Sequence, residues 1–395
     1  MLTSQETRHN PTPLYQQLRT SEPLVRLQMP GGTQAYLLTR YDDALQILKD
    51  PRLLKDSRQV LTPEERQKLI RNEEAAELLT RHMLSSDGMD HTRLRNLVSK
   101  AFTPRAIERM RDRIQQITDE LIDAVQEKGS MDLIAEFAFP LPITVISELL
   151  GIPVEHRQKF RVWTNALLNS NGFQDPQAKQ DVHNFITYLK EFIAEKRANP
   201  DQEMVSKLIQ ADEAGDTFSE AELISMVFLL IIAGHETTVN LIGNGTLALL
   251  QHPDQLHKLQ QHPDLVISAV EELLRYTAPV EISTQRWTSE DMELYGQVIP
   301  KGSMVMVSLL SANTDTNEFM DADQLDITRK ENKHIAFGKG LHFCLGAPLA
   351  RLEGQIAFNT LLRRLPDLSL DGDPKDLVWR SNLLLHGLNS LPVTF

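Results

Sequence analysis

The feature that most constrains the fold is a long helical segment that no proline interrupts between Ser219 and Pro253. Its first residues, Ser219-Glu220-Ala221-Glu222, have the Ser-x-x-Glu form of a capping box, in which two side chains satisfy free backbone N–H groups. A helix over 220–251 is about 48 Å long. Its middle, 226–233, is apolar on every side, which is typical of a helix inside a protein. We therefore expect a mainly helical protein built around this segment.

The remaining pattern agrees with a mainly α fold that has a smaller β portion. Residues 23–40 alternate like short strands around a Gly-Gly turn, and 303–310 is also strand-like. No repeat, low-complexity tract or linker is evident in the sequence, so we expect a single continuous domain over 1–395. The clearest other helices, judged by a period of 3.6 residues, are predicted at 41–49, 104–127, 180–196 and 347–365.

Charge and composition exclude some classes of function. Lys and Arg number 41 against 54 Asp and Glu, and this net charge of −13 argues against a protein that binds duplex nucleic acid. The N-terminal residues lack a signal-peptide pattern, and the longest apolar run is far shorter than the roughly 20 residues of a membrane span. The single cysteine cannot form an internal disulfide, so a reducing compartment fits. We expect a cytoplasmic protein that does not bind a membrane.

That cysteine lies in an unusual loop, Phe337-Gly338-Lys339-Gly340-Leu341-His342-Phe343-Cys344-Leu345-Gly346. Glycines let the backbone approach the sulfur closely, and the helix that follows turns its positive end toward it. Both features stabilise a thiolate, and the two phenylalanines can keep water away. The alternative is an inert buried cysteine, which is the usual state of a lone cysteine. However, six fixed positions in ten arise by chance only about once in 10⁸ starting points.

The loop matches the pattern FGxGxHxCxG completely and resembles the cysteine loop of the cytochrome P450 superfamily. The resemblance implies the P450 fold, with the long helix over a haem b group. It also implies that Cys344 is the axial iron ligand and that His342 contacts a haem propionate. Phe337 and Gly338 are further expected haem contacts.

Two other motifs resemble the same family. Glu272 and Arg275 are three residues apart on one helix face, where they can pair, although many such pairs are only surface salt bridges. The resemblance implies a structural role for them. By the same resemblance, Gln324 is expected to replace the arginine that often completes this network, and Arg329 is left open as its substitute.

A cationic group is expected to hold the haem propionates. His91 and Arg95 are four residues apart and share a helix face, so both could reach one anion, although spacing alone also fits a surface basic patch. Resemblance of His91-Thr92-Arg93-Leu94-Arg95 to a family segment favours propionate binding, and it adds Arg286 to the set.

The long helix carries Ala233-Gly234-His235-Glu236-Thr237-Thr238, which resembles the oxygen-activating motif of the family. We expect Glu236 to supply protons and Thr237 to hold oxygen and a water molecule. Gly234 is expected to let the helix open locally, with Ala233 and Gly234 beside the haem. The alternative is a surface glutamate and a helix-bending threonine, but the flanking run is too apolar for a solvated face. His235 should point to another face and not bind iron.

The substrate pocket is expected to be lipophilic. Leu229, Ile232 and Ala233 lie on the stripe of the helix that carries Glu236. The resemblance adds 280–284, including Val280 and Ile282, and the loops around 80–88, 165–175 and 383–388.

The implied activity is a haem-thiolate monooxygenase that inserts one atom of O2 into a lipophilic substrate. By resemblance to soluble bacterial members, the substrate is a polyketide or macrolide, with steroids, terpenoids and fatty acids open. A ferredoxin or flavodoxin with an NAD(P)H-dependent reductase is expected to supply electrons, and a monomer is expected. The alternatives are a peroxide-driven haem peroxygenase and a non-catalytic haem-binding protein.

Overall fold

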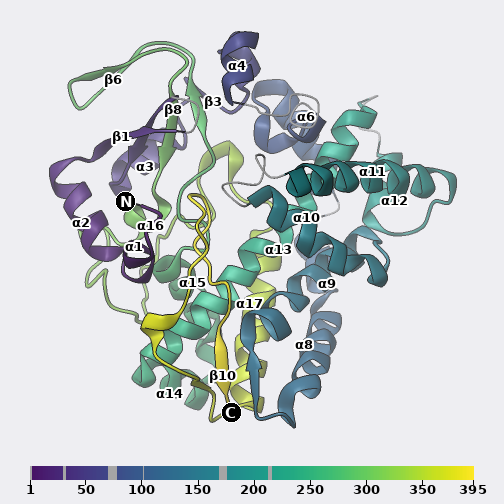
Figure 1. The fold of residues 1–395 in the computed structure, drawn as a ribbon, viewed down its shortest axis with the longest axis vertical. Helices are drawn as coiled ribbons and strands as arrows, with labels where there is room; N and C mark the ends of the chain where they lie inside the picture. Colours follow the sequence, from purple (N-terminus) through teal and green to yellow (C-terminus); the bar gives the residue numbers. More distant parts are fainter. Residues whose placement is uncertain (1, 30–32, 70–77, 101, 169–175, 212–215) are drawn as a thin grey trace.

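The computed structural model describes residues 2–29, 33–69, 78–100, 102–168, 176–211 and 216–395, and the helix α13 (Glu220–Gln251) runs through its middle (Figure 1). The predicted capping box is present: the Ser219 side chain accepts from the Glu222 N–H, and the Glu222 side chain accepts from the Ser219 N–H. The helix is therefore fixed at its first turn, and both of its predicted ends are confirmed.

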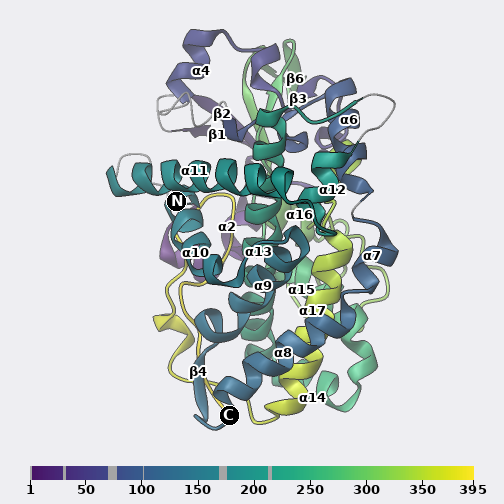
Figure 2. The same ribbon diagram turned by 90° about the vertical axis from the view of Figure 1, so that its right-hand side faces the viewer.

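Helices α9, α11, α15 and α17 pack directly against α13 and bury it (Figure 2). The last of these, α17, starts three residues after Cys344, so the cysteine loop enters a helix that contacts α13. The helices are α1 (Gln5–His9), α2 (Thr12–Ser21), α3 (Tyr41–Ile47), α4 (Pro63–Leu69), α6 (Gly88–Ser99), α7 (Pro104–Glu108), α8 (Arg111–Gln126), α9 (Pro140–Leu150), α10 (Arg157–Leu168), α11 (Pro176–Ala198), α12 (Met204–Gln210), α13, α14 (Pro253–Gln261), α15 (Val266–Thr277), α16 (Leu309–Asn313) and α17 (Ala347–Arg364).

The β portion forms one larger sheet and two small ones. In Figure 1 the larger sheet lies on the left, away from α8 to α12. Its order is β1-β2-β8-β5-β3, in which β2 and β8 are parallel and the other pairs are antiparallel. The small sheets are β4-β10-β9 and β6-β7. The strands are β1 (Leu24–Gln28), β2 (Gln34–Leu38), β3 (Leu53–Leu54), β4 (Ser130–Asp132), β5 (Arg286–Thr288), β6 (Met292–Leu294), β7 (Gln297–Ile299), β8 (Met304–Val307), β9 (Ser369–Leu370) and β10 (Pro392–Thr394).

Two predicted elements differ from the structure. The helix predicted over 104–127 is two helices, α7 and α8, that meet at Arg109 and Met110. The strand predicted over 303–310 ends at Val307, because the Ser308 side chain accepts a hydrogen bond from the Ser311 N–H and caps α16. The glycines of the predicted turn after β1 lie outside the described residues.

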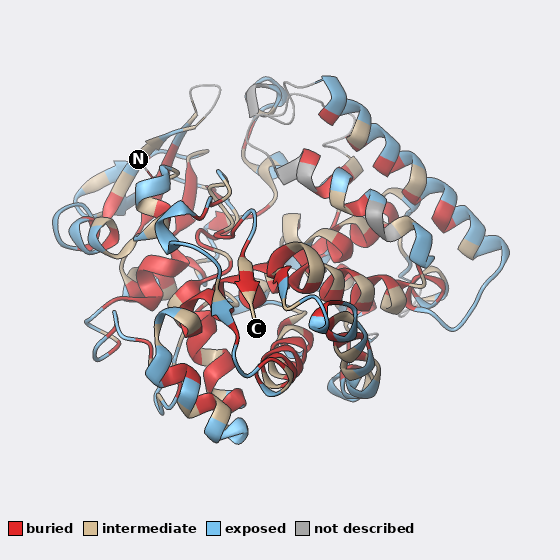
Figure 3. Cartoon of the chain, turned by 60° about the horizontal axis from the view of Figure 1, so that its bottom comes forward, coloured by how far each residue is buried: buried red, intermediate tan, exposed pale blue. Residues whose placement is uncertain are grey.

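Burial is concentrated on the interior helices, while the outer faces of the peripheral helices are exposed (Figure 3). Among the described residues, α13 is the one helix whose length and composition would suit a membrane span. Most of that stretch is buried inside the protein, which is equally typical of a core helix.

Candidate active site

The cysteine loop is a tight turn that places Cys344 in front of a helix N-terminus. Gly338 and Gly340 have φ angles of 69° and 77°, a region that favours glycine. A Cβ on Gly340 would also lie 3.0 Å from the Leu48 carbonyl oxygen, so both φ and space require glycine there. The Cys344 N–H donates to the Phe337 carbonyl at 3.0 Å and closes the loop.

The Cys344 thiol has surroundings that suit an anion. Burial raises the pKa of this thiol, while hydrogen bonds from the backbone N–H groups of Gly346 and Ala347 and the charges of Arg95 and Arg351 act to lower it. The residue is nevertheless exposed. The thiol is thus surrounded by protein atoms without being covered by them. The N–H groups at the start of α17 are those that the sequence predicted.

The four predicted cationic residues come from two elements, α6 and β5, and from the cysteine loop, and they lie around one region. The rings of His91 and His342 are 4.4 Å apart, and Arg95 donates to the Phe343 carbonyl at 2.8 Å. Arg286, on β5, is 5% exposed and acts electrostatically on His342. The structure therefore brings together His91, Arg95, Arg286 and His342.

Several polar atoms of this group have no partner. His91 is 3% exposed, and both of its ring nitrogens lack a hydrogen bond. The Arg286 Nε also lacks one. Burial lowers the pKa of His91 to about 4, and the charges of His342 and Arg95 act in the same direction. Buried donors without acceptors are costly, so this region is built for an anionic ligand.

Two further residues belong to this group and carried no sequence signal. The Lys55 Nζ is buried and donates to the Thr284 and Gln285 carbonyls. Burial lowers the pKa of Lys55, as does the charge of Arg286. Asp87 accepts from the Lys55 and Asp56 N–H groups and lies 3.9 Å from the His342 ring. Asp87 thus places a carboxylate beside the cations.

The middle of α13 is incompletely covered by other protein atoms at Ala233 and Thr237. Ala233 is exposed and Thr237 is half-buried, although most of this helix is buried. The Thr237 hydroxyl donates to the Ala233 carbonyl at 2.9 Å, which leaves its oxygen able to accept. These two residues thus form an opening in the protein cover of the helix.

Glu236 is buried and ion-paired. It is 2% exposed, and its Oε2 lies 2.6 Å from the Arg380 Nη1. Burial acts to raise the pKa of Glu236, but His235 and Arg380 outweigh it and hold the pKa at about 2. The surface alternative for Glu236 is therefore wrong. Glu236 is ionised, so it can pass a proton only after it has taken one up. Arg380 was missed because it lies outside any motif.

The two residues before Glu236 have packing roles. Contrary to expectation, α13 runs without a break through Gly234. A Cβ on Gly234 would lie 2.9 Å from the Ile146 side chain of α9, so close packing requires the glycine. His235 is fully buried against Phe139, and its Nε2 is 3.2 Å from the Glu236 Oε1. His235 points to another face than Thr237, as predicted from its position.

The predicted pocket wall is only partly exposed. Ile232 and Val280 are half-buried, and Leu229 is 8% exposed. Ile282 is fully buried in a core cluster with Trp287 and does not face an open space, so the prediction that it lines the pocket is wrong. Of the predicted loops, 169–175 lies outside the described residues.

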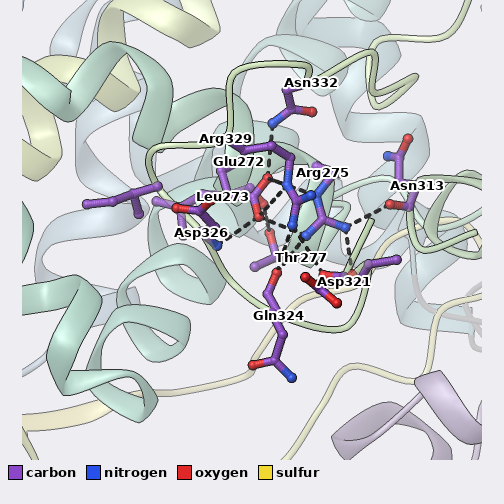
Figure 4. A network of polar contacts seen from close by, with 12 residues as sticks. Glu272, Leu273, Arg275, Thr277, Asn313, Asp321, Gln324, Asp326, Arg329 and Asn332 are labelled. Carbon is purple, nitrogen blue, oxygen red and sulfur yellow. Dashed lines mark hydrogen bonds and ion pairs between the residues drawn. The ribbon is translucent and has the colours of Figure 1, made fainter. Parts of the chain in front are cut away.

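Glu272 and Arg275 form the predicted pair, and Arg329 joins it (Figure 4). Arg275 donates to both Glu272 oxygens at 2.8 Å, and Arg329 donates to the same oxygens at 3.1 and 3.2 Å. Asn332 adds a third donor at 3.0 Å. Gln324 contributes only its backbone carbonyl. Arg329 therefore occupies the place that the sequence left open.

Comparison with known proteins agrees with this geometry. The cytochrome P450 family model matches residues 3–386. The chain belongs to the cytochrome P450 family. It is 50% identical over 384 residues to a cytochrome P450 of Bacillus subtilis, covering 96% of this chain and 93% of the relative.

Two solved P450 structures are also close. The bacillaene polyketide synthase P450 PksS of Bacillus subtilis is 45% identical with a TM-score of 0.93, over 100% of this chain and 99% of that chain. The myxobacterial P450 CYP267B1 in complex with myristic acid is 46% identical with a TM-score of 0.95, over 100% and 98%. This P450 is thus a haem-thiolate monooxygenase that uses haem b, and P450 enzymes of this kind receive electrons from redox partners.

The residues of this P450 fit a haem. The unpartnered nitrogens of His91 and Arg286 suit the two anionic propionates, and the exposed Cys344 suits a thiolate ligand. When bound, the haem supplies the activation of O2 and the transfer of oxygen. The protein supplies orientation, electrostatics and control of water.

Proposed function

We propose that this P450 oxidises a lipophilic molecule of polyketide or fatty-acyl type, with Cys344 as the iron ligand. The carrying observation is that the protein cover of the otherwise buried α13 has an opening at Ala233 and Thr237, next to the ion-paired Glu236. The residues beside this opening, Ile232 and Leu229, are apolar, which favours an apolar substrate. Two relatives are described with a polyketide pathway and with myristic acid, which supports the substrate class.

Glu236 and Thr237 are proposed to deliver protons to the reacting oxygen. Glu236 leaves Arg380, takes up a proton from water and passes it on through a water molecule held by the Thr237 oxygen. The Thr237 hydroxyl returns to the Ala233 carbonyl between transfers. Because His235 and Arg380 together hold the pKa of Glu236 at about 2, these two contacts keep this proton path closed at rest.

His91, Arg95, Arg286 and His342 are proposed to bind the propionates, with Phe337 and Gly338 against the haem. In this role Arg286 and His91 gain the acceptors that they now lack. Asp87 offsets part of the positive charge and holds the Lys55 backbone, so it orients the group and does not bind the anion itself.

The electron donor is proposed to be a ferredoxin or flavodoxin with an NAD(P)H-dependent reductase. Lys339 in the cysteine loop and Arg105 on α7 are exposed and available to an acidic partner. Arg93 does not belong to this surface, because it is ion-paired with Glu222. A cytoplasmic monomer of one continuous domain is part of the same proposal.

The central experiment is a reduced carbon-monoxide difference spectrum of the wild type and Cys344→Ser. A thiolate-type Soret band is expected in the wild type and not in the variant. Absence of that band in the wild type would contradict the assignment of Cys344. Titration with myristic acid and with a macrolide aglycone, followed by the Soret shift, then tests the substrate class; no shift with either would overturn it.

None of the structural features described above favours a peroxide-driven route over the O2 route. Turnover with hydrogen peroxide alone, at the rate that a reductase supports, would reverse this preference. Similarly, a haem-binding protein without activity would give no product with either oxidant.

A further inference from the structure

The segment that carries Arg380 is a hairpin, Trp379–Leu388, here called the C-terminal hairpin. Trp379 and Leu388 form a bridge, and the Arg380 N–H donates to the Gly387 carbonyl at 2.9 Å. One side of this hairpin faces α13: Arg380 pairs with Glu236, and the Asn244 side chain donates to the His386 carbonyl at 2.8 Å. The position of the hairpin therefore sets the position of the Arg380 guanidinium.

The other side of the C-terminal hairpin is held by the short N-terminal helix α1. The Gln5 side chain donates to the Trp379 carbonyl at 2.8 Å and accepts from the Trp379 N–H at 3.0 Å. The Trp379 indole donates to the His9 ring at 3.0 Å. Residues 370 or more positions apart in the sequence are thus joined by side-chain hydrogen bonds.

Arg8 is the centre of this attachment. Its side chain is 1% exposed and pairs with Glu281, which is also buried. The guanidinium donates to the Leu385 carbonyl at 3.2 Å and to the Asn382 carbonyl. These two carbonyls lie at the turn of the hairpin, between Arg380 and Gly387. The buried Arg8 guanidinium therefore fixes the turn of the C-terminal hairpin.

Glu281 connects the Arg8 guanidinium to the neighbouring segment that contains Val280. The Tyr15 hydroxyl donates to its Oε1 at 2.6 Å, and its own N–H donates to the Leu384 carbonyl at 2.8 Å. The adjacent residue Val280 bridges to Leu385. Although the Arg8 Nε has no partner, the other polar atoms of this buried ion pair are hydrogen-bonded, and they would lose these partners in another arrangement, so the pair is well placed to fix one geometry.

We infer that Arg8 is a positioning residue for Glu236, which it controls through the C-terminal hairpin and Arg380. The hairpin, held by Arg8, presents the Arg380 guanidinium to the Glu236 carboxylate and so sets when that carboxylate can be protonated. Arg8 itself lies outside the catalytic groups. This inference rests on the proposed function, because it takes Glu236 as the acid of the proton path.

Arg19 provides a matched control. It is also a buried arginine of an N-terminal helix, at 7% exposure, and it bonds the Ser311 carbonyl at 2.9 Å and the side chains of Ser311 and Thr314. These partners belong to α16 and the residue that follows it, not to the C-terminal hairpin. Arg19→Met therefore removes a comparable buried cation without touching the hairpin.

The test uses the haem-loaded full chain with three variants: Arg8→Lys, Arg8→Met combined with Glu281→Gln, and Arg19→Met. The double variant avoids an unpaired buried carboxylate, so it is expected to fold. The first readout is hydrogen–deuterium exchange over 379–388. The second is peroxide released per NADPH, with a ferredoxin and its reductase and with myristic acid as probe.

In the double variant, exchange of the Arg380 and His386 amides is expected to rise about tenfold, and the peroxide fraction to roughly double or more. Arg8→Lys should show smaller changes. Arg19→Met should lower the melting temperature and leave both readouts unchanged. Equal effects of the Arg8 and Arg19 variants, or no change of exchange in the double variant, would overturn the inference.

Glu236→Gln separates this inference from the proposed function. If it raises the peroxide fraction while the Arg8 variants do not, the proton path stands and the role of Arg8 is wrong. If Glu236→Gln leaves the peroxide fraction unchanged, the proposed proton path is wrong, and the inference falls with it.

Discussion

The Nη1 of Arg380 lies 2.6 Å from the Oε2 of Glu236, so the C-terminal hairpin is ion-paired to the middle of the central helix. The carboxylate is 2% exposed and the arginine side chain 22%. Removal of one partner of such a pair costs more folding stability than removal of one partner of a surface salt bridge, because it leaves a buried charge.

Arg380→Met is expected to destabilise the protein by about 2 kcal/mol, less than for a fully buried pair because the arginine is partly solvated. The cause is the uncompensated Glu236 carboxylate. In the Glu236→Gln background the same substitution should cost less than half as much. Urea unfolding of the four proteins of this double-mutant cycle measures the difference, and equal costs in both backgrounds would show that the pair contributes nothing.

Thr237→Ala is expected to lower product per NADPH about tenfold and to release the missing electrons as peroxide. The reason is that the alanine cannot hold the water molecule through which Glu236 passes a proton. Thr237→Ser keeps the hydroxyl and should stay near the wild type. Peroxide and product are quantified in the same reaction; an unchanged product yield in Thr237→Ala would argue against the proton path.

Glu353→Gln is expected to remove a pH dependence of stability. Burial on α17 raises the pKa of Glu353 to about 8, and the nearby Thr238 acts in the other direction. The folded state therefore holds this proton more tightly than the unfolded state, so the contribution of Glu353 to stability falls as pH rises from about 4.5 toward 8.

At pH 7 this loss amounts to about 3 kcal/mol relative to pH 4.5. The glutamine variant should consequently gain stability over the wild type with increasing pH and be nearly equal to it near pH 4.5. Thermal unfolding at pH 5, 6, 7 and 8 tests the trend. Parallel curves for the two proteins would mean that Glu353 is not protonated in the folded state.

Local sequence patterns were sufficient to predict much of this fold. The capping box and the apolar middle predicted α13 with both of its ends, because these signals lie within the helix itself. The helix predicted over 104–127 was wrong at Arg109, where no proline or glycine marks the break. Tertiary packing decides where such a break falls, and the hydrophobic periodicity of the sequence does not reveal it.

The residues of the site were likewise predicted in part and missed in part. His91, Arg95 and His342 were predicted because they lie in short motifs, and the structure brings their side chains together. Lys55 and Arg380 were missed, because each reaches its place through a fold contact between distant segments. Ile282 was misplaced because its neighbours in the core come from other parts of the chain.

Arg329→Gln is expected to destabilise the protein by about 3 kcal/mol, since it leaves the fully buried Glu272 with fewer donors. Gln324→Ala is the matched control: Gln324 lies in the same segment but offers only its backbone carbonyl to Arg275 and Arg329, which the alanine retains. Arg329→Lys should recover part of the loss, because one ammonium cannot replace the guanidinium on both oxygens. Haem retention during urea unfolding reports whether this network supports the haem site. If Arg329→Gln and Gln324→Ala unfold at the same urea concentration, Arg329 has no structural role in this P450.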